Sequence, residues 1–180
     1  YPITHRGGVH QTLITYLKDY YTINQDGDTQ VYLSCLNDIS RVFDETIDAM
    51  RNRAENGVIL PSYLITMIVD NCREIISGYS FEGQGNCPVM EDFLVKVNSA
   101  AGMTPAQRTI RIAEMETALL TSMGPAYQRL INYLENELMP LADEEAGGAL
   151  FHDEGGNALG TQRFVQGGEY HQCISGSTIG

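Results

Sequence analysis

Apolar residues recur at steps of three and four along the chain as far as Leu141, which is the spacing of one face of an α-helix. Glycine, proline and short polar stretches interrupt the pattern, which therefore predicts about six amphipathic helices joined by short turns. There is no convincing pair of strands and no internal repeat, so the predicted fold class is all-α, a multi-helix bundle. The expected helices cover residues 9–21, 28–56, 62–76, 89–98, 105–123 and 126–138.

Local signals set the expected ends and faces of these helices. Asp28 or Thr29 suits the N-cap position of the second helix, and Thr104-Pro105 is a cap followed by a first-turn proline. Gly124-Pro125 is expected to separate the last two helices, because both residues are helix breakers. In the first helix, the stripe expected to be apolar consists of Val9, Leu13, Tyr16, Leu17 and Tyr20.

The helical pattern ends near Leu141, and the rest of the chain has a different composition. Half of the eighteen glycines lie after residue 146, within an acidic stretch that has no sustained period. The sequence therefore predicts a helical body over residues 1–141 and a glycine-rich, irregular, loop-rich segment over residues 142–180. We expect this segment to pack on a missing C-terminal half or on a second chain, because its apolar residues need a surface. These residues are Phe151, Leu159, Phe164, Val165 and Tyr170.

Charge and hydropathy limit the kinds of partner. The net charge of -12 argues against a nucleic-acid binder, since phosphate contacts require clustered lysine and arginine. No stretch approaches the roughly 20 apolar residues of a membrane span, and no such span is expected. A cation site or an acidic environment would also fit the charge, but solubility is the commonest reason for an acidic surface.

The four cysteines leave two readings open. Cys72 and Cys87 flank a glycine-rich loop that a disulfide could close, which would place the protein outside the cell or in another oxidising compartment. The alternative is two buried free thiols, because free cysteine often behaves as a small apolar residue. No C-x-x-C pair suited to zinc or redox chemistry is present.

Candidate catalytic and metal-binding residues are few. The four histidines form no H-E-x-x-H motif, and the two in HRGGVH lie five residues apart, which gives no common helix face. Asn24, Asp26 and Asp28 alternate like the start of a calcium loop, but the required glycine and glutamate do not follow. His171 and Cys173 are too close in sequence for a typical nucleophile and base. We therefore assign no catalytic and no metal-binding residue in this chain.

The order of several short motifs resembles a known family. GVHQTLITYL near the start, YQRLINYLENELMPLAD from residue 127 and GGEYHQC from residue 167 resemble the N-terminal half of the domain of unknown function 885 family. The resemblance implies an α-helical, zinc-metallopeptidase-like protein whose H-E-x-x-H motif lies in a C-terminal half outside this chain. It implies zinc in the complete protein, and no position here matches the active-site motif.

Two functional hypotheses follow from the resemblance. In the first, the chain is the N-terminal, non-metal-binding portion, or processed subunit, of a zinc-peptidase-like hydrolase, and it shapes a cleft for a peptide substrate. Gly180 would then be a processing site and the C-terminal half of the precursor a second chain, forming a secreted heterodimer. Cys173 would pair with Cys35 or bridge to that chain. In the second, the chain is a non-catalytic secreted binding or toxin-like subunit of a two-chain complex.

Overall fold

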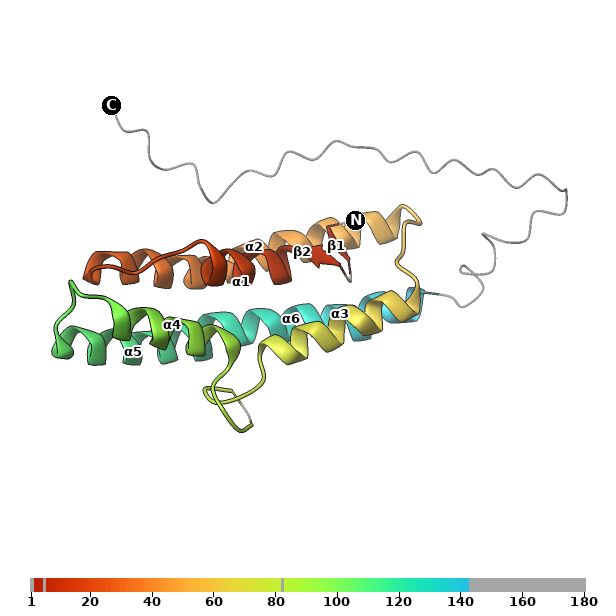
Figure 1. Ribbon diagram of the computed structural model, residues 1–180. Helices are drawn as coiled ribbons and strands as arrows, with labels where there is room; N and C mark the ends of the chain where they lie inside the picture. Colours follow the sequence, from red (N-terminus) through yellow and green to blue (C-terminus); the bar gives the residue numbers. More distant parts are fainter. Residues whose placement is uncertain (1, 5, 82, 143–180) are drawn as a thin grey trace, which may run out of the picture.

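The computed structural model describes residues 2–4, 6–81 and 83–142, and within them the all-α prediction is confirmed (Figure 1). The expected irregular segment 142–180, apart from Ala142, and Cys173 lie outside the described residues. The α-helices are α1 (Val9–Asp19), α2 (Asp26–Glu55), α3 (Ser62–Ile75), α4 (Pro88–Ser99), α5 (Pro105–Ala118) and α6 (Gly124–Tyr133). The remaining elements are β1 (Ile3–Thr4), β2 (Gly7–Gly8), the π turns η1 (Leu119–Met123) and η2 (Leu134–Leu138), and the 3-10 turn η3 (Met139–Leu141).

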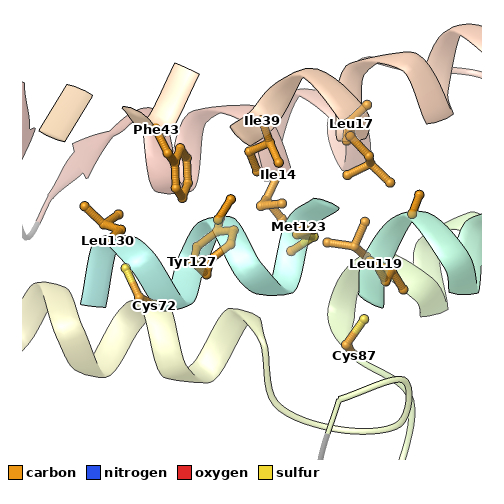
Figure 2. Packing of buried hydrophobic residues seen from close by; sticks show 14 of the residues in the cluster. Ile14, Leu17, Ile39, Phe43, Cys72, Cys87, Leu119, Met123, Tyr127 and Leu130 are labelled. Carbon is orange, nitrogen blue, oxygen red and sulfur yellow. The ribbon is translucent and has the colours of Figure 1, made fainter. Parts of the chain in front are cut away.

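The helices form two layers with the core between them. Figure 1 shows α1, α2 and the small hairpin on one side and α3 to α6 on the other. Side chains from both layers meet in the middle, as Figure 2 shows for Phe43 of α2 against Tyr127 of α6, whose ring centroids are 4.8 Å apart. The long helix α2 contributes a buried residue about once a turn, which is the arrangement that its sequence period predicts.

The buried face of α1 differs from the expected stripe. His10, Ile14 and Leu17 are the buried residues of this helix. Of the predicted stripe, Leu17 is fully buried, whereas Val9, Leu13 and Tyr16 are only partly buried and Tyr20 is 75% exposed. The predicted face was wrong by about one residue around the helix, because the stripe was built from apolar residues alone and left out His10.

The two predicted N-caps had different outcomes. Thr104 is confirmed as the N-cap of α5, where its hydroxyl accepts a hydrogen bond from the Gln107 backbone N–H at 3.3 Å. The prediction for α2 was wrong by about three residues, because the N-cap is Gln25 and Asp28 occupies the third helical position. The Asp28 carboxylate accepts backbone N–H bonds from Asn24 and Gln25 at 2.8 and 3.1 Å, and these bonds lower its pKa. This reciprocal capping box replaces the simple cap that was expected.

The predicted break at Gly124-Pro125 does not occur. The backbone runs from Pro105 to Leu141 as one continuous helical rod that contains two π turns, and each π turn ends two residues before a proline. The N–H of Gly124 bonds to the carbonyl of Leu119, and that of Met139 to the carbonyl of Leu134. A proline inside a helix clashes with the carbonyl four residues earlier. A widened turn before Pro125 and before Pro140 is compatible with continuing the helix past both rings.

A short hairpin precedes α1 and was not expected from the sequence. Ile3 pairs with Gly8 and Thr4 with Gly7 in antiparallel register. Two residues per strand are too few for a period of two to be recognisable. Ile3 is fully buried, so the hairpin adds to the core.

Candidate functional site

The helix α2 and the helical rod formed by α5, η1, α6, η2 and η3 lie side by side and point the same way. Four polar pairs join them at nearly constant separation in sequence, 85 residues for three pairs and 86 for the fourth. A constant separation is expected only for parallel helices in fixed register. We call this face the seam. Its pairs are Asp26–Arg111 at 2.7 Å, Asn37–Ser122 at 2.8 Å, Asp44–Arg129 at 3.0 Å and Arg51–Glu137 at 3.0 Å.

The seam combines an apolar interior with a polar border. Asn37, Asp44 and Arg51 are spaced by seven residues, which places them on one side of α2, as in a coiled coil. Beneath them, Phe43 packs edge-on against Tyr127. The Asp26 pKa is lowered, chiefly by its hydrogen bond to Arg111, so this pair is charged at neutral pH. Exposed pairs add little stability, and their main effect is on register.

Two shallow grooves lie along the seam. Groove 1, between α2 and α5, has a volume of about 680 Å³, and groove 2, between α2 and the region of α6 and η2, has about 520 Å³. Groove 1 is lined by Gln30, Leu33, Ser34, Asn37, Ile110, Ala113, Glu114, Thr117, Ala118 and Thr121. Groove 2 is lined by Ile47, Arg51, Arg129, Asn132, Tyr133, Asn136 and Glu137.

The two grooves differ in chemistry. Glu114 is the one charged residue among those that line groove 1, and its carboxylate is bound to Arg111 at 2.7 Å. In groove 2 the guanidinium of Arg51 lies 5.4 Å from the centre of the Tyr133 ring and pairs with Glu137. Groove 1 therefore suits an apolar occupant, while groove 2 offers arginine, asparagine and aromatic groups.

A buried polar cluster lies behind the seam. The His10 side chain is fully buried, and neither of its ring nitrogens has a hydrogen-bond partner among the described residues. Burial lowers the pKa of His10 to about 4, so the ring is neutral at neutral pH. The Tyr127 hydroxyl donates a hydrogen bond to the His10 backbone carbonyl. Burial raises the pKa of Tyr127 well above its usual value. The apolar period of the sequence gave no signal for this cluster.

The described cysteines differ in burial, and none of them forms the predicted Cys72–Cys87 disulfide. Cys72 and Cys87 are buried free thiols, so the disulfide between them is not formed in the structure. Figure 2 shows Cys72 beside Tyr127 and Leu130, and Cys87 near Leu119. Burial raises the Cys72 pKa to about 12, which leaves it an unreactive thiol. Cys35 is half-buried in α2.

The loop between these cysteines is organised by its backbone. Gly78 has φ +91°, and an added Cβ would lie 2.9 Å from the Gly85 carbonyl oxygen. The Cys87 N–H donates to the Tyr79 carbonyl at 3.4 Å. On the other side, the Phe81 ring would lie 2.8 Å from a Cβ on Gly124. Close packing at these glycines shapes the loop without a covalent link.

The described residues do not fit a zinc ion. Within residues 2–4, 6–81 and 83–142, no group of three or more His, Cys, Asp or Glu could hold a metal. None of the described helices is both long and apolar enough to cross a bilayer.

Together, these features describe an all-α bundle that presents an exposed face of two parallel helices. The chain belongs to the family described as "Bacterial protein of unknown function (DUF885)", whose family model matches residues 1–165. That description names no activity, so the zinc-peptidase-like character expected from the resemblance stays a prediction.

One solved structure supports the fold. The chain is similar to the crystal structure of the "putative lipoprotein from Colwellia psychrerythraea", with a TM-score of 0.70 and 16% sequence identity. The similarity covers 77% of this chain and 23% of the Colwellia chain, so this chain corresponds to less than a quarter of that protein. No match was found among curated proteins.

Proposed function

We propose that the chain is the N-terminal, non-metal-binding portion of a zinc-peptidase-like hydrolase and that it forms one wall of the substrate cleft. The catalytic residues would lie in another segment of the same precursor. The observation that carries this proposal is the seam, an exposed face whose register is fixed by four polar pairs, on a unit whose fold matches 23% of a larger chain.

The seam has the properties that a cleft wall needs. Two long helices packed through Phe43 and Tyr127 form a rigid support, and binding residues on such supports are held more precisely than those on loops. Groove 2 lies on this support and offers groups that can bind a peptide, with Arg129 and Asn132 at its border. Guanidinium groups bind carboxylates, and asparagine amides bind peptide groups.

An exported location is part of the same proposal. The Colwellia protein is described as a "putative lipoprotein", and this favours an exported or envelope-associated protein. A C-terminal half carried as a second chain would complete the cleft.

Metal analysis and a hydrolysis assay on native material test the proposal. We expect the complete protein to contain zinc and to cleave a fluorogenic peptide library in a chelator-sensitive way, while this chain alone contains no zinc and is inactive. A complete protein without zinc and without hydrolysis would contradict the proposal and favour the non-catalytic binding subunit.

A groove variant tests the role of the wall. Asn132→Trp fills groove 2, and we expect it to raise the KM for peptide at least about fivefold while kcat changes less than twofold, because the chemistry lies elsewhere. Asn98→Trp, at an exposed position of α4, is the matched control. Equal kinetics for the two variants would exclude groove 2 from the cleft.

A further inference from the structure

We propose that groove 1 is the docking site for the chain's own downstream segment, residues 150–165. The proposal concerns a different groove from the one assigned to substrate. It rests on the shape of the seam and on the family match, and it holds or fails independently of hydrolase activity.

Groove 1 has the surface of an unfilled packing interface. Leu33 and Ala118 form a buried floor, and Ile110 at its rim is 55% exposed. Between them on α5, Ala113 and Thr117 have small side chains, and Glu114 is paired with Arg111, which leaves room for side chains from another segment. An apolar surface of this kind gains free energy when it is covered.

The downstream segment begins at the end of the same helical rod. The last described residue, Ala142, is partly buried and its N–H bonds to the Met139 carbonyl at 3.0 Å. The family model continues to residue 165, so residues 143–165 belong to the same family unit as the helices. Their sequence supplies apolar groups for the groove. These groups are Leu150, Phe151, Leu159, Phe164 and Val165.

The length of this segment is sufficient to reach groove 1. Along the helical rod, Ala142 lies roughly 31 Å from Thr121 and roughly 48 Å from Ile110, at 1.5 Å per residue. An extended chain covers roughly 3.3 Å per residue, so about 10 residues reach the near end of the groove and about 15 reach the far end. Residues from about 152 onward can therefore lie in groove 1.

Charge favours this occupant over a second copy of the chain. The first residues after Ala142 are Asp143, Glu144 and Glu145, and on the way to groove 1 they would pass groove 2. There the side chains of Arg51 and Arg129 each remain 43% exposed, although both are paired with carboxylates. A second copy would bring together two chains of net charge -12, which repel one another.

Site-specific photo-crosslinking in the full chain tests the proposal. A benzophenone side chain is placed at Thr117, which lines groove 1, or at Thr109, which is exposed on α5 and does not line it. The two positions are matched, because each threonine hydroxyl donates to the carbonyl four residues earlier. We expect Thr117 to crosslink within one chain to residues 150–165, mapped by mass spectrometry, with at least fivefold higher yield than Thr109.

A second variant separates specific docking from chance contact. Phe151→Asp should lower the Thr117 crosslink at least fivefold while the helical circular dichroism stays unchanged. Crosslinks between two copies, equal yields from both positions, or no crosslink from Thr117 would each overturn the proposal.

Discussion

The two ends of α1 are attached to the bundle by different chemistry. At its C-terminal end, the Lys96 ammonium donates to the carbonyls of Leu17 and Lys18 at 2.5 and 2.9 Å and to the Asp92 carboxylate at 2.8 Å. At its N-terminal end, the Tyr127 hydroxyl bonds to the His10 carbonyl, while the His10 ring has no partner among the described residues. At the C-terminal end the helix carbonyls have a hydrogen-bond donor, whereas at the N-terminal end the titratable His10 ring is buried without a partner among the described residues.

This difference separates two ways of holding a helix in place. A cation at a helix C-terminus complements the helix dipole and satisfies carbonyls that lack partners. The Tyr32 hydroxyl donates to Asp92 at 3.2 Å, which completes the cluster around Lys96. At the other end, burial lowers the His10 pKa to about 4, and stability there depends on keeping the ring neutral. The C-terminal attachment is therefore built from charges, and the N-terminal one is acid-sensitive.

Removing Lys96 should have the largest effect. Lys96→Met leaves the Asp92 carboxylate, whose side chain is only 14% exposed, without its cation. We expect a loss of about 3 kcal/mol in the free energy of unfolding, as for other pairs broken on one side. Urea denaturation measures it. Lys18→Met, at an exposed lysine of α1, should change stability by less than about 0.5 kcal/mol. Similar losses in both variants would contradict the assigned role of Lys96.

Acid should lower the free energy of unfolding by a comparable amount, through protonation of His10 at the N-terminal end of α1. The folded pKa of His10, about 4, lies below its value of 6.5 in the unfolded chain, so the unfolded state takes up the proton first. The contribution of His10 to stability is complete above pH 6.5 and is lost as the pH falls to about 4, by about 3 kcal/mol in total.

The measurement compares the wild type with His10→Leu across that range of pH, because the carboxylates titrate in both proteins. The difference between the two unfolding free energies should change by about 3 kcal/mol between pH 7 and pH 4. A constant difference would show that the ring is not held neutral by burial.

The glycine that precedes α1 should be the next most sensitive position. A Cβ on Gly8 would lie 2.9 Å from the Ile3 Cα and 3.1 Å from the His10 ring, and its φ of +154° is unfavourable for other residues. We expect Gly8→Ala to cost about 2 kcal/mol in thermal or urea unfolding. Gly7→Ala is the control, since nothing lies within 4 Å of a Cβ there. If Gly7→Ala costs as much, close packing of the hairpin is not the cause.

The smallest effect should come from the tyrosine hydroxyl. Tyr127→Phe keeps the ring against Phe43 and removes the hydrogen bond to the His10 carbonyl. We expect a loss of about 1 kcal/mol in chemical denaturation, the usual net value of one buried hydrogen bond. Tyr63→Phe, at a residue 64% exposed, should be neutral. If Tyr127→Phe lost more stability than Lys96→Met, the N-terminal attachment of α1 would be the stronger one, contrary to this expectation.

The sequence predicted the helices well because their signals are local. The threefold and fourfold spacing of apolar residues identified each helix, and Thr104 was identified as a cap from its own type and from Pro105. The same local reasoning was wrong at Gly124-Pro125, where a π turn lets the helix continue. It was also wrong for the face of α1, where a buried histidine takes a position that periodicity reserves for apolar residues.

The candidate site had no local signal. The paired residues of the seam, such as Asp44 and Arg129, are 85 residues apart, and neither is unusual for an exposed helical position. Their meeting depends on how two long helices pack, and no local pattern in the sequence reveals that packing. Likewise, nothing in the local sequence around His10 shows that its ring would be enclosed without a partner.

The π turn η2 sets the direction of the backbone at the end of the helical rod. The sequence separation across the seam grows from 85 at Asp44–Arg129 to 86 at Arg51–Glu137, and η2 (Leu134–Leu138) lies across this step. Deleting one residue there would restore an ordinary α-turn and rotate everything after it by about 100° around the helix axis. The direction of the backbone at Ala142, the last described residue, therefore depends on one residue in η2.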